Sequence, residues 1–178
     1  MARAASSAAT LSPPMKRTAT AALAALVNSE VLHCDETGMR VDSALNWVHV
    51  ASTREAAYYR VDDKRGQEAM ERMEILPQFS GCAVHDHWQS YYGYDCEHAL
   101  CNAHHSRELI HAEEEHQQSW AGKLRRCLLA AKAEVDTARE RGRSALSEER
   151  VRHWGKSYRG ILRRGQKELP PAPESRGT

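Results

Sequence analysis

The sequence predicts an α/β fold in which a mixed sheet, three antiparallel strands followed by parallel ones, is joined to a helical C-terminal region. Three observations lead to this prediction. Two short apolar runs each end in an aspartate, Asp35 and Asp86. Between them lie two further strand-like runs and one run with helical spacing. Beyond about residue 105, apolar residues recur three and four residues apart, which is typical of helices.

Length and composition indicate one compact domain with an appended helical piece. The chain has 178 residues, of which 41% are hydrophobic, and its 25 basic and 24 acidic residues give a formal charge of +1. Net charge therefore does not point to a polyanionic partner. Five cysteines are an odd number, which favours free thiols in a reducing cytoplasm over a disulfide framework. We expect a cytoplasmic protein that does not enter a membrane.

The expected elements begin with a helix over about residues 14–28, after a tail rich in Ala, Ser and Thr. The first strand is expected to end at Asp35, because Thr37 and Gly38 are typical of a turn. Strands over residues 44–51 and 56–61 follow, joined by short polar connections that predict hairpins.

A helix over residues 67–78, ended by Pro77, should cross over to a strand at residues 81–86. This crossover makes the new strand parallel to the first and brings Asp86 alongside Asp35. A last short strand is expected within residues 98–105.

The remaining chain should be helical over residues 105–143 and 150–167. The first of these segments carries an apolar stripe that includes Trp120, Leu124 and Leu128. We expect the second helix or another chain to cover that stripe. The predicted domains are a disordered tail (1–13), a partial core (14–105), a helical insertion (106–168) and a second disordered tail (169–178).

Asp35 and Asp86 are the candidate metal ligands. Carboxylate oxygens at neighbouring strand ends can hold Mg²⁺ or Mn²⁺ in the way that two-metal phosphoryl transfer requires. A strand-end Asp is, however, more often a turn former, so only the pairing of the two acids supports a catalytic role. Glu36 should point away from Asp35 if the strand continues, as a solvent-facing or supporting group.

Cys101 and His104 have zinc-like spacing, with Cys96, His98 and His105 nearby in the sequence. A structural zinc site needs four ligands, and the usual paired motif is absent. A buried thiol beside a histidine is the alternative interpretation.

The order of strands and helices, with carboxylates on the first and fourth strands, is that of the ribonuclease-H-like fold. The chain also resembles the catalytic core of the insertion-sequence-66 family of DDE transposases, from about residue 14 to about residue 168. Seven motifs in the right order carry this resemblance: Asp35-Glu36-Thr37-Gly38, Asn46-Trp47-Val48-His49-Val50, Lys64-Arg65-Gly66, Phe79-Ser80-Gly81, Val84-His85-Asp86-His87-Trp88, Tyr91, and Cys101-Asn102-Ala103-His104-His105-Ser106-Arg107-Glu108-Leu109.

The resemblance implies Mg²⁺-dependent (or Mn²⁺-dependent) DNA cleavage and strand transfer, with Asp35 and Asp86 as the first two acids of a catalytic triad. The implied partner is DNA at the ends of a mobile element, and association between copies of the chain is left open. The third acid of the family is a glutamate in a downstream motif that this sequence does not contain. We therefore expect a fragment, truncated at both ends, that is inactive alone, with Glu108 the best placed substitute.

Two other functions remain open from the sequence. The chain could be a non-catalytic remnant that keeps a nucleic-acid-binding or dimerising surface, or a zinc-binding adaptor built on Cys101 and His104.

Overall fold

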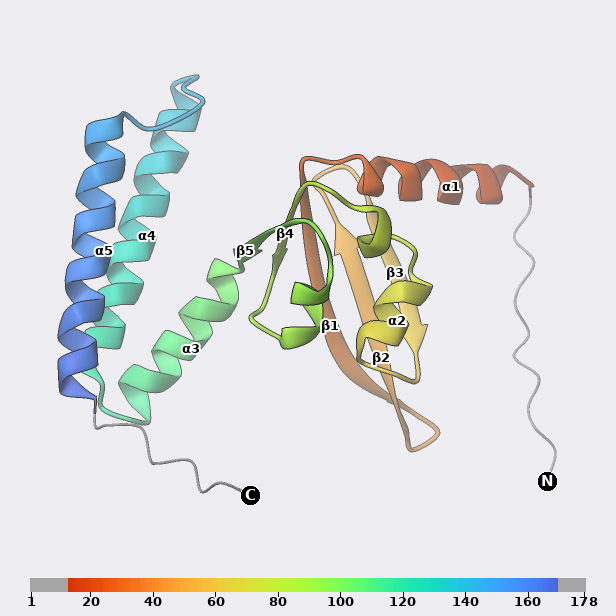
Figure 1. The fold of residues 1–178 in the computed structure, drawn as a ribbon, viewed down its shortest axis with the longest axis horizontal. Helices are drawn as coiled ribbons and strands as arrows, with labels where there is room; N and C mark the ends of the chain where they lie inside the picture. Colours follow the sequence, from red (N-terminus) through yellow and green to blue (C-terminus); the bar gives the residue numbers. More distant parts are fainter. Residues whose placement is uncertain (1–12, 170–178) are drawn as a thin grey trace. The chain divides into compact units, whose positions relative to one another are not determined.

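The computed structural model describes residues 13–169, which form two compact units that divide between Cys101 and Asn102 (Figure 1). The predicted tails, residues 1–13 and 169–178, fall outside the described range apart from Pro13, which begins a helix, and Leu169. No helix in the described range is long and apolar enough to cross a membrane.

The first unit is built on a five-stranded sheet with the order β3-β2-β1-β4-β5. Its elements are α1 (Pro13–Val27), β1 (Val31–Val41), β2 (Ala44–Ser52), β3 (Ala57–Asp62), α2 (Gln67–Arg72), η1 (Leu76–Gln78), β4 (Cys82–His85), η2 (Gln89–Gly93) and β5 (Glu97–Leu100).

Strand directions confirm the predicted fold class. β1 pairs antiparallel with β2, and β2 pairs antiparallel with β3. β4 and β5 then add in parallel on the other side of β1. Three antiparallel strands followed by parallel ones make the mixed sheet of a ribonuclease-H-like fold.

One face of this sheet carries the core, as the alternation of side chains along β1 shows. Leu32 and Cys34 are buried, whereas Val31 and Asp35 are exposed on the opposite face. The buried face packs against residues of α2, η1, η2 and the loops between them, namely Met70, Met73, Ile75, Leu76, Phe79, Tyr91 and Tyr94. Leu26, near the end of α1, belongs to the same core.

The end of the first strand was predicted wrongly. β1 continues past Asp35 to Val41, and the chain turns at Asp42 and Ser43, which have positive φ angles of 48° and 67°. Gly38 stays extended because it pairs with Trp47 of β2, where an added Cβ would meet the Leu45 and Trp47 side chains. Asp35 therefore lies in the middle of a long strand.

The helix predicted over residues 67–78 is also wrong in extent. α2 ends at Arg72, Glu74 adopts a positive φ of 60°, and a separate turn of 3-10 helix follows at Leu76–Gln78. Pro77 has no amide N–H and cannot sit inside an α-helix, so the chain breaks before reaching it.

The second unit consists of three helices, α3 (Asn102–Glu114), α4 (Ser119–Glu140) and α5 (Glu148–Glu168). β5 ends at Leu100, so residues 102–105, expected in the last strand, are helical. The single helix expected over residues 105–143 is broken near Gln117, which has a positive φ of 54°. A residue in that conformation cannot continue a right-handed helix.

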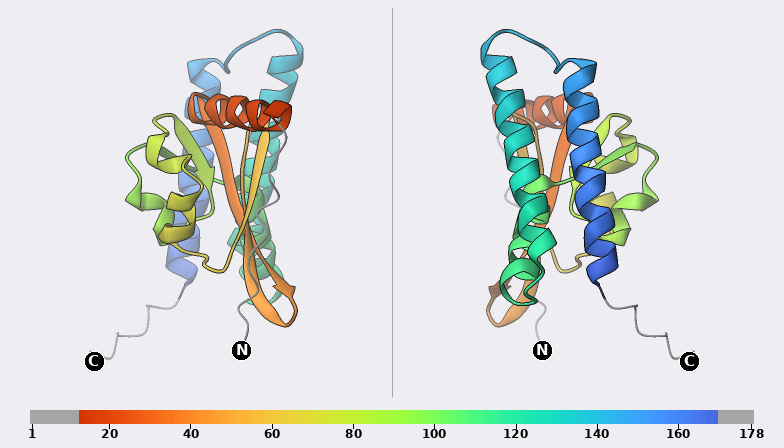
Figure 2. Two further views of the ribbon diagram at one scale, coloured as in Figure 1. Left: turned by 90° about the vertical axis from the view of Figure 1, so that its right-hand side faces the viewer. Right: turned by 90° about the vertical axis from the view of Figure 1, so that its left-hand side faces the viewer.

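α4 and α5 form a helical hairpin (Figure 2). Their contact confirms that α5 covers the apolar stripe of α4, since Leu124 and Ile161 are buried together with Leu109 and Ala121. The Arg150 guanidinium donates two hydrogen bonds of 2.7 Å to the Glu134 carboxylate, which also accepts one from the Trp154 indole at 2.8 Å. These bonds hold the pKa of Glu134 at about 2.

Gly165 lets α4 and α5 approach closely, and this gives a testable prediction. A Cβ at Gly165 would lie 2.5 Å from the Trp120 indole, whereas a Cβ at Gly160 would meet nothing within 4 Å. We expect Gly165→Ala to lower the melting temperature, because overpacking costs about 1–3 kcal/mol. Gly160→Ala should raise it, because Ala stabilises a helix interior by about 1 kcal/mol relative to Gly. Thermal melts followed by circular dichroism test the pair, and equal shifts would contradict this account of Gly165.

Candidate active site

Asp35 lies on β1, and Asp86 follows the end of β4, the strand that pairs in parallel with β1. β1 and β4 pair through His33 and Val84, and the two aspartates each follow two residues later. Asp35 is exposed within its unit and accepts a hydrogen bond from the Glu36 amide at 2.9 Å. Asp86 follows directly after the end of β4 and is partly exposed, with 23% of its side chain accessible.

The next residue along β1, Glu36, is the most buried carboxylate of this region. Its side chain is only 1% exposed and points to the core face of the sheet. Arg65 donates two hydrogen bonds to Oε1, from Nε at 3.0 Å and from Nη2 at 2.7 Å. The Tyr91 hydroxyl donates a third, to Oε2, at 2.5 Å. A buried carboxylate requires such compensation, because leaving a charge unpaired in the interior is very costly.

Arg65 also connects Glu36 to Asp86. Its Nη2 lies 4.0 Å from Oδ2 of Asp86, while the other oxygen, Oδ1, accepts the Trp88 amide at 2.9 Å. The guanidinium is flanked by two indoles, with its carbon 4.1 Å from the Trp88 ring centroid and 4.9 Å from that of Trp47. Stacking on aromatic faces restricts the guanidinium, so Arg65 can orient both acids.

The loop that carries Arg65 is held by buried polar groups. The His49 ring, 2% exposed, donates from Nε2 to the Lys64 carbonyl at 3.0 Å. The Lys64 amide donates to Asp62 at 3.0 Å. Asp62 in turn accepts two hydrogen bonds from Arg72, at 2.8 and 2.5 Å, which hold its pKa well below the usual range. Both polar groups of the Lys64 backbone are thus fixed next to Arg65.

The rings of Tyr91 and His85 pack against each other next to Glu36. The two rings stack with centroids 4.4 Å apart and an interplanar angle of 18°. Burial, together with the neighbouring Glu36 charge, raises the pKa of Tyr91 far above its ordinary value, so the hydroxyl remains a donor. Burial also lowers the pKa of His85, whose Nδ1 contacts the Asp86 backbone carbonyl. Its Nε2 lies 2.9 Å from Nδ1 of His98.

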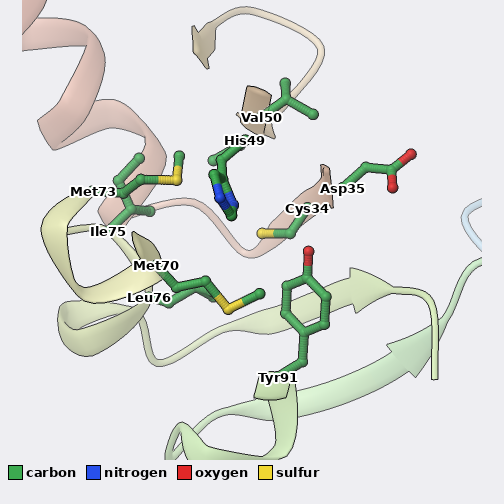
Figure 3. A pocket seen from close by; sticks show the side chains of 10 residues that line it. Cys34, Asp35, His49, Val50, Met70, Met73, Ile75, Leu76 and Tyr91 are labelled. Atoms are coloured by element: carbon green, nitrogen blue, oxygen red, sulfur yellow. The ribbon is translucent and has the colours of Figure 1, made fainter. Parts of the chain in front are cut away.

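The interior gap beside these residues has no room for a ligand. It measures about 10 Å³ and is lined mainly by core residues, with Cys34, His49 and Tyr91 at one side (Figure 3). Burial raises the pKa of the Cys34 thiol to about 12, so it stays neutral. Asp35 belongs to the edge of the same region, but its carboxylate points away from the gap (Figure 3). Chemistry at Asp35 would therefore take place on the exposed side of β1.

Cys101 lies in the connection between β5 and α3, and His104 lies within α3. Cys101 follows β5, and its amide donates to the His85 carbonyl at 2.7 Å, whereas His104 lies in the first turn of α3. Over residues 13–169, no three His, Cys, Asp or Glu side chains gather in a way that could hold a metal ion. All five cysteines carry free thiols.

Two of the residues that assemble this site were not identified from the sequence. Arg65 and Tyr91 lie in motifs that carry the family resemblance, but no role at the site was predicted for either residue. One pattern in the sequence could have identified them: a carboxylate at an inward-facing strand position, followed by an Arg in a later loop. A buried carboxylate needs a positively charged or hydrogen-bonding partner, because burying an unpaired charge is costly. Glu36 was correctly expected to point away from Asp35, but it faces the core and not solvent.

Comparison with known proteins gives one family and several distant structures. The model described as "Transposase IS66 family" matches residues 2–176. No curated protein matches the chain. A chain in the cryo-EM structure of the simian T-cell lymphotropic virus intasome, in complex with the PP2A regulatory subunit B56 gamma, is 12% identical with a TM-score of 0.35. That match covers 86% of the present chain and 60% of the other.

Two structures of the HTLV-2 integrase catalytic core domain in complex with magnesium are also similar. The dimeric form is 11% identical and the trimeric form 12%, each with a TM-score of 0.33. They cover 75% and 72% of the present chain, and each match spans 82% of the integrase chain.

Proposed function

The chain belongs to the IS66 family of transposases, and from this membership we propose that it is part of the catalytic core of an enzyme of DNA transposition. The proposed reaction is divalent-metal-dependent cleavage of DNA followed by strand transfer. Its proposed substrate is the DNA at the ends of a mobile element. Asp35 and Asp86 are the proposed ligands of Mg²⁺ or Mn²⁺.

The observation that supports this proposal best is the parallel pairing of β1 with β4, since Asp35 and Asp86 each follow the last paired residues, His33 and Val84, by two positions. Both side chains offer carboxylate oxygens, the ligands that Mg²⁺ and Mn²⁺ prefer, and both are accessible to solvent within their unit. The donor set therefore fits a hard divalent ion. When bound, the metal would neutralise negative charge on a phosphodiester and activate an attacking hydroxyl.

The protein's own contribution is to keep Asp86 in place. The Trp88 amide engages one carboxylate oxygen, and Arg65 lies next to the other. Glu36 anchors Arg65 from the buried side of the sheet through two hydrogen bonds. In this arrangement Glu36 is a supporting residue, since its own oxygens are engaged by Arg65 and Tyr91.

A non-catalytic DNA-binding or dimerising module is the second candidate. The observation that favours it is that the described residues bring no third carboxylate to Asp35 and Asp86 in a form able to hold a metal. A zinc-binding adaptor has less support, because no three His, Cys, Asp or Glu side chains of residues 13–169 gather around Cys101 and His104 in a way that could hold a metal ion.

Titration of the purified chain with Mn²⁺, followed by electron paramagnetic resonance, tests the proposed function. We expect weak binding whose affinity falls by more than about tenfold in Asp35→Asn and in Asp86→Asn. Mutating residues that only support metal ligands already lowers metal affinity about 10–100-fold, and these two variants change the proposed ligands themselves. Asp42→Asn is the matched control. Asp42 is exposed at the β1–β2 turn with a positive φ that Asn also accepts, so this variant should bind Mn²⁺ like the wild type. Equal binding by all four proteins would rule out the proposed metal ligands.

A further inference from the structure

α5 presents a line of positive charge along its exposed face. Arg152, Lys156, Arg159, Arg163 and Lys167 follow one another at steps of four, three, four and four residues. At 100° per residue they fall within about 80° of one another around the helix axis. All five are exposed. We call these five residues the basic stripe; at 1.5 Å per residue it is about 22 Å long.

The charges of the basic stripe are poorly compensated by the sequence around them. Residues 150–167 contain no Asp or Glu, and the acids Glu148 and Glu149 precede the stripe in the first turn of α5. Glu148 accepts a hydrogen bond from Arg152 at 3.1 Å. On α4, by contrast, basic side chains have acidic neighbours, as Lys132 has in Asp136 and Arg126 in Glu113.

The opposite face of α5 is already occupied. Ile161 and Gly165 are buried, Leu162 packs against the same cluster, and Gly165 lies against the Trp120 ring. Helices that lie in a membrane interface need an apolar face free to enter the lipid, and the main apolar face of α5 packs against α4. A helix that carries a straight row of cations and has no free apolar face is instead suited to bind a polyanion with regularly spaced charges. Double-stranded DNA carries about one phosphate charge per 1.7 Å of its axis.

We propose that the basic stripe binds the phosphate backbone of double-stranded DNA without reading its sequence. The proposal rests on the proposed function for the choice of DNA as partner. It adds that the contact is made by the helical unit, which contains neither Asp35 nor Asp86. Backbone contacts of this kind supply affinity and orientation, while sequence must be read elsewhere.

The test is the salt dependence of binding to a fluorescent DNA duplex of random sequence, measured by anisotropy in EDTA. The variants are a stripe variant (Lys156→Gln, Arg159→Gln, Arg163→Gln) and a matched control from α4 (Lys123→Gln, Lys132→Gln, Arg139→Gln). Both remove three positive charges and use Gln, a good helix former. Circular dichroism melts check that all proteins fold. Since each phosphate contact contributes about 0.9 to the slope of log K against log salt, the stripe variant should lower that slope by about 2 to 3.

We expect the stripe variant to weaken binding more than tenfold at moderate salt and the α4 control to stay within about threefold of the wild type. Equal losses in the two variants would mean that only net charge matters and would overturn the proposal. So would unchanged binding by the stripe variant, or wild-type binding to phosphatidylserine vesicles in place of DNA. Because EDTA removes metal, the duplex assay does not depend on whether Asp35 and Asp86 hold an ion. Loss of Mn²⁺ binding therefore tests the proposed function separately from this inference.

Discussion

Residues 1–178, assayed by themselves, are expected to show no Mg²⁺- or Mn²⁺-dependent nicking or strand transfer on DNA that carries the ends of the element. Two-metal catalysis needs carboxylates that fix both ions. Asp35 and Asp86 are the two proposed metal ligands, and the neighbouring Glu36 is buried and engaged by Arg65 and Tyr91. The expected effect is a complete loss of turnover, with DNA binding retained.

The comparison for this assay is a longer polypeptide that includes the glutamate motif expected from the family resemblance. That protein should cleave, and its Asp86→Ala variant should not. Metal-dependent cleavage by residues 1–178 that disappears in Asp86→Ala would overturn the prediction. Glu108→Gln would then show whether Glu108, in α3, serves as the substitute.

Arg65→Ala is expected to cause a large loss of stability in the first unit. It leaves the Glu36 carboxylate buried without its cation, a change that costs about 3–5 kcal/mol for a fully buried pair. Arg65 is 38% exposed, so we expect the free energy of unfolding to fall by about 2–4 kcal/mol. Urea unfolding followed by circular dichroism measures this change.

Two further variants distinguish the loss of stability caused by breaking the charge pair from the loss caused by removing side-chain volume. Glu36→Gln combined with Arg65→Ala should be more stable than Arg65→Ala alone, because the unpaired charge is gone. Arg54→Ala, at an exposed turn position, should change stability by less than about 0.5 kcal/mol. If Arg65→Ala behaved like Arg54→Ala, Glu36 would not depend on Arg65 in the way described.

The sheet and its order could be predicted from the sequence because the signals for them are local. β-Branched and aromatic runs mark the strands, and short polar connections mark the hairpin between β2 and β3. The crossover through α2 then requires β4 to lie parallel to β1, as it does. The apolar spacing of α4 likewise predicted that α5 or another chain would cover it, and α5 does so.

The ends of helices and strands were predicted less accurately than their order. A short stretch can favour both a turn and a strand, and the segment that pairs with it determines which one forms. Thr37 and Gly38 favour a turn in isolation, but nine paired residues of β2 hold them in a continuous strand. The break near Gln117 between α3 and α4 was missed for a similar reason. It is set by the packing of the two helices against each other, which no short stretch of sequence encodes.

By itself, the sequence determined the strand directions and the amphipathic pattern of the helices, because these follow from side-chain periodicity and chain connectivity. Only the tertiary structure decided which acid is exposed and which is buried. Arg65 and Tyr91 lie 29 and 55 residues from Glu36 in the sequence, and they meet its carboxylate only when η2 and the β3–α2 loop close over the sheet. The burial of Glu36, and the pairing that compensates it, depend on that closure, because the cost of burying a charge is set by everything packed around it.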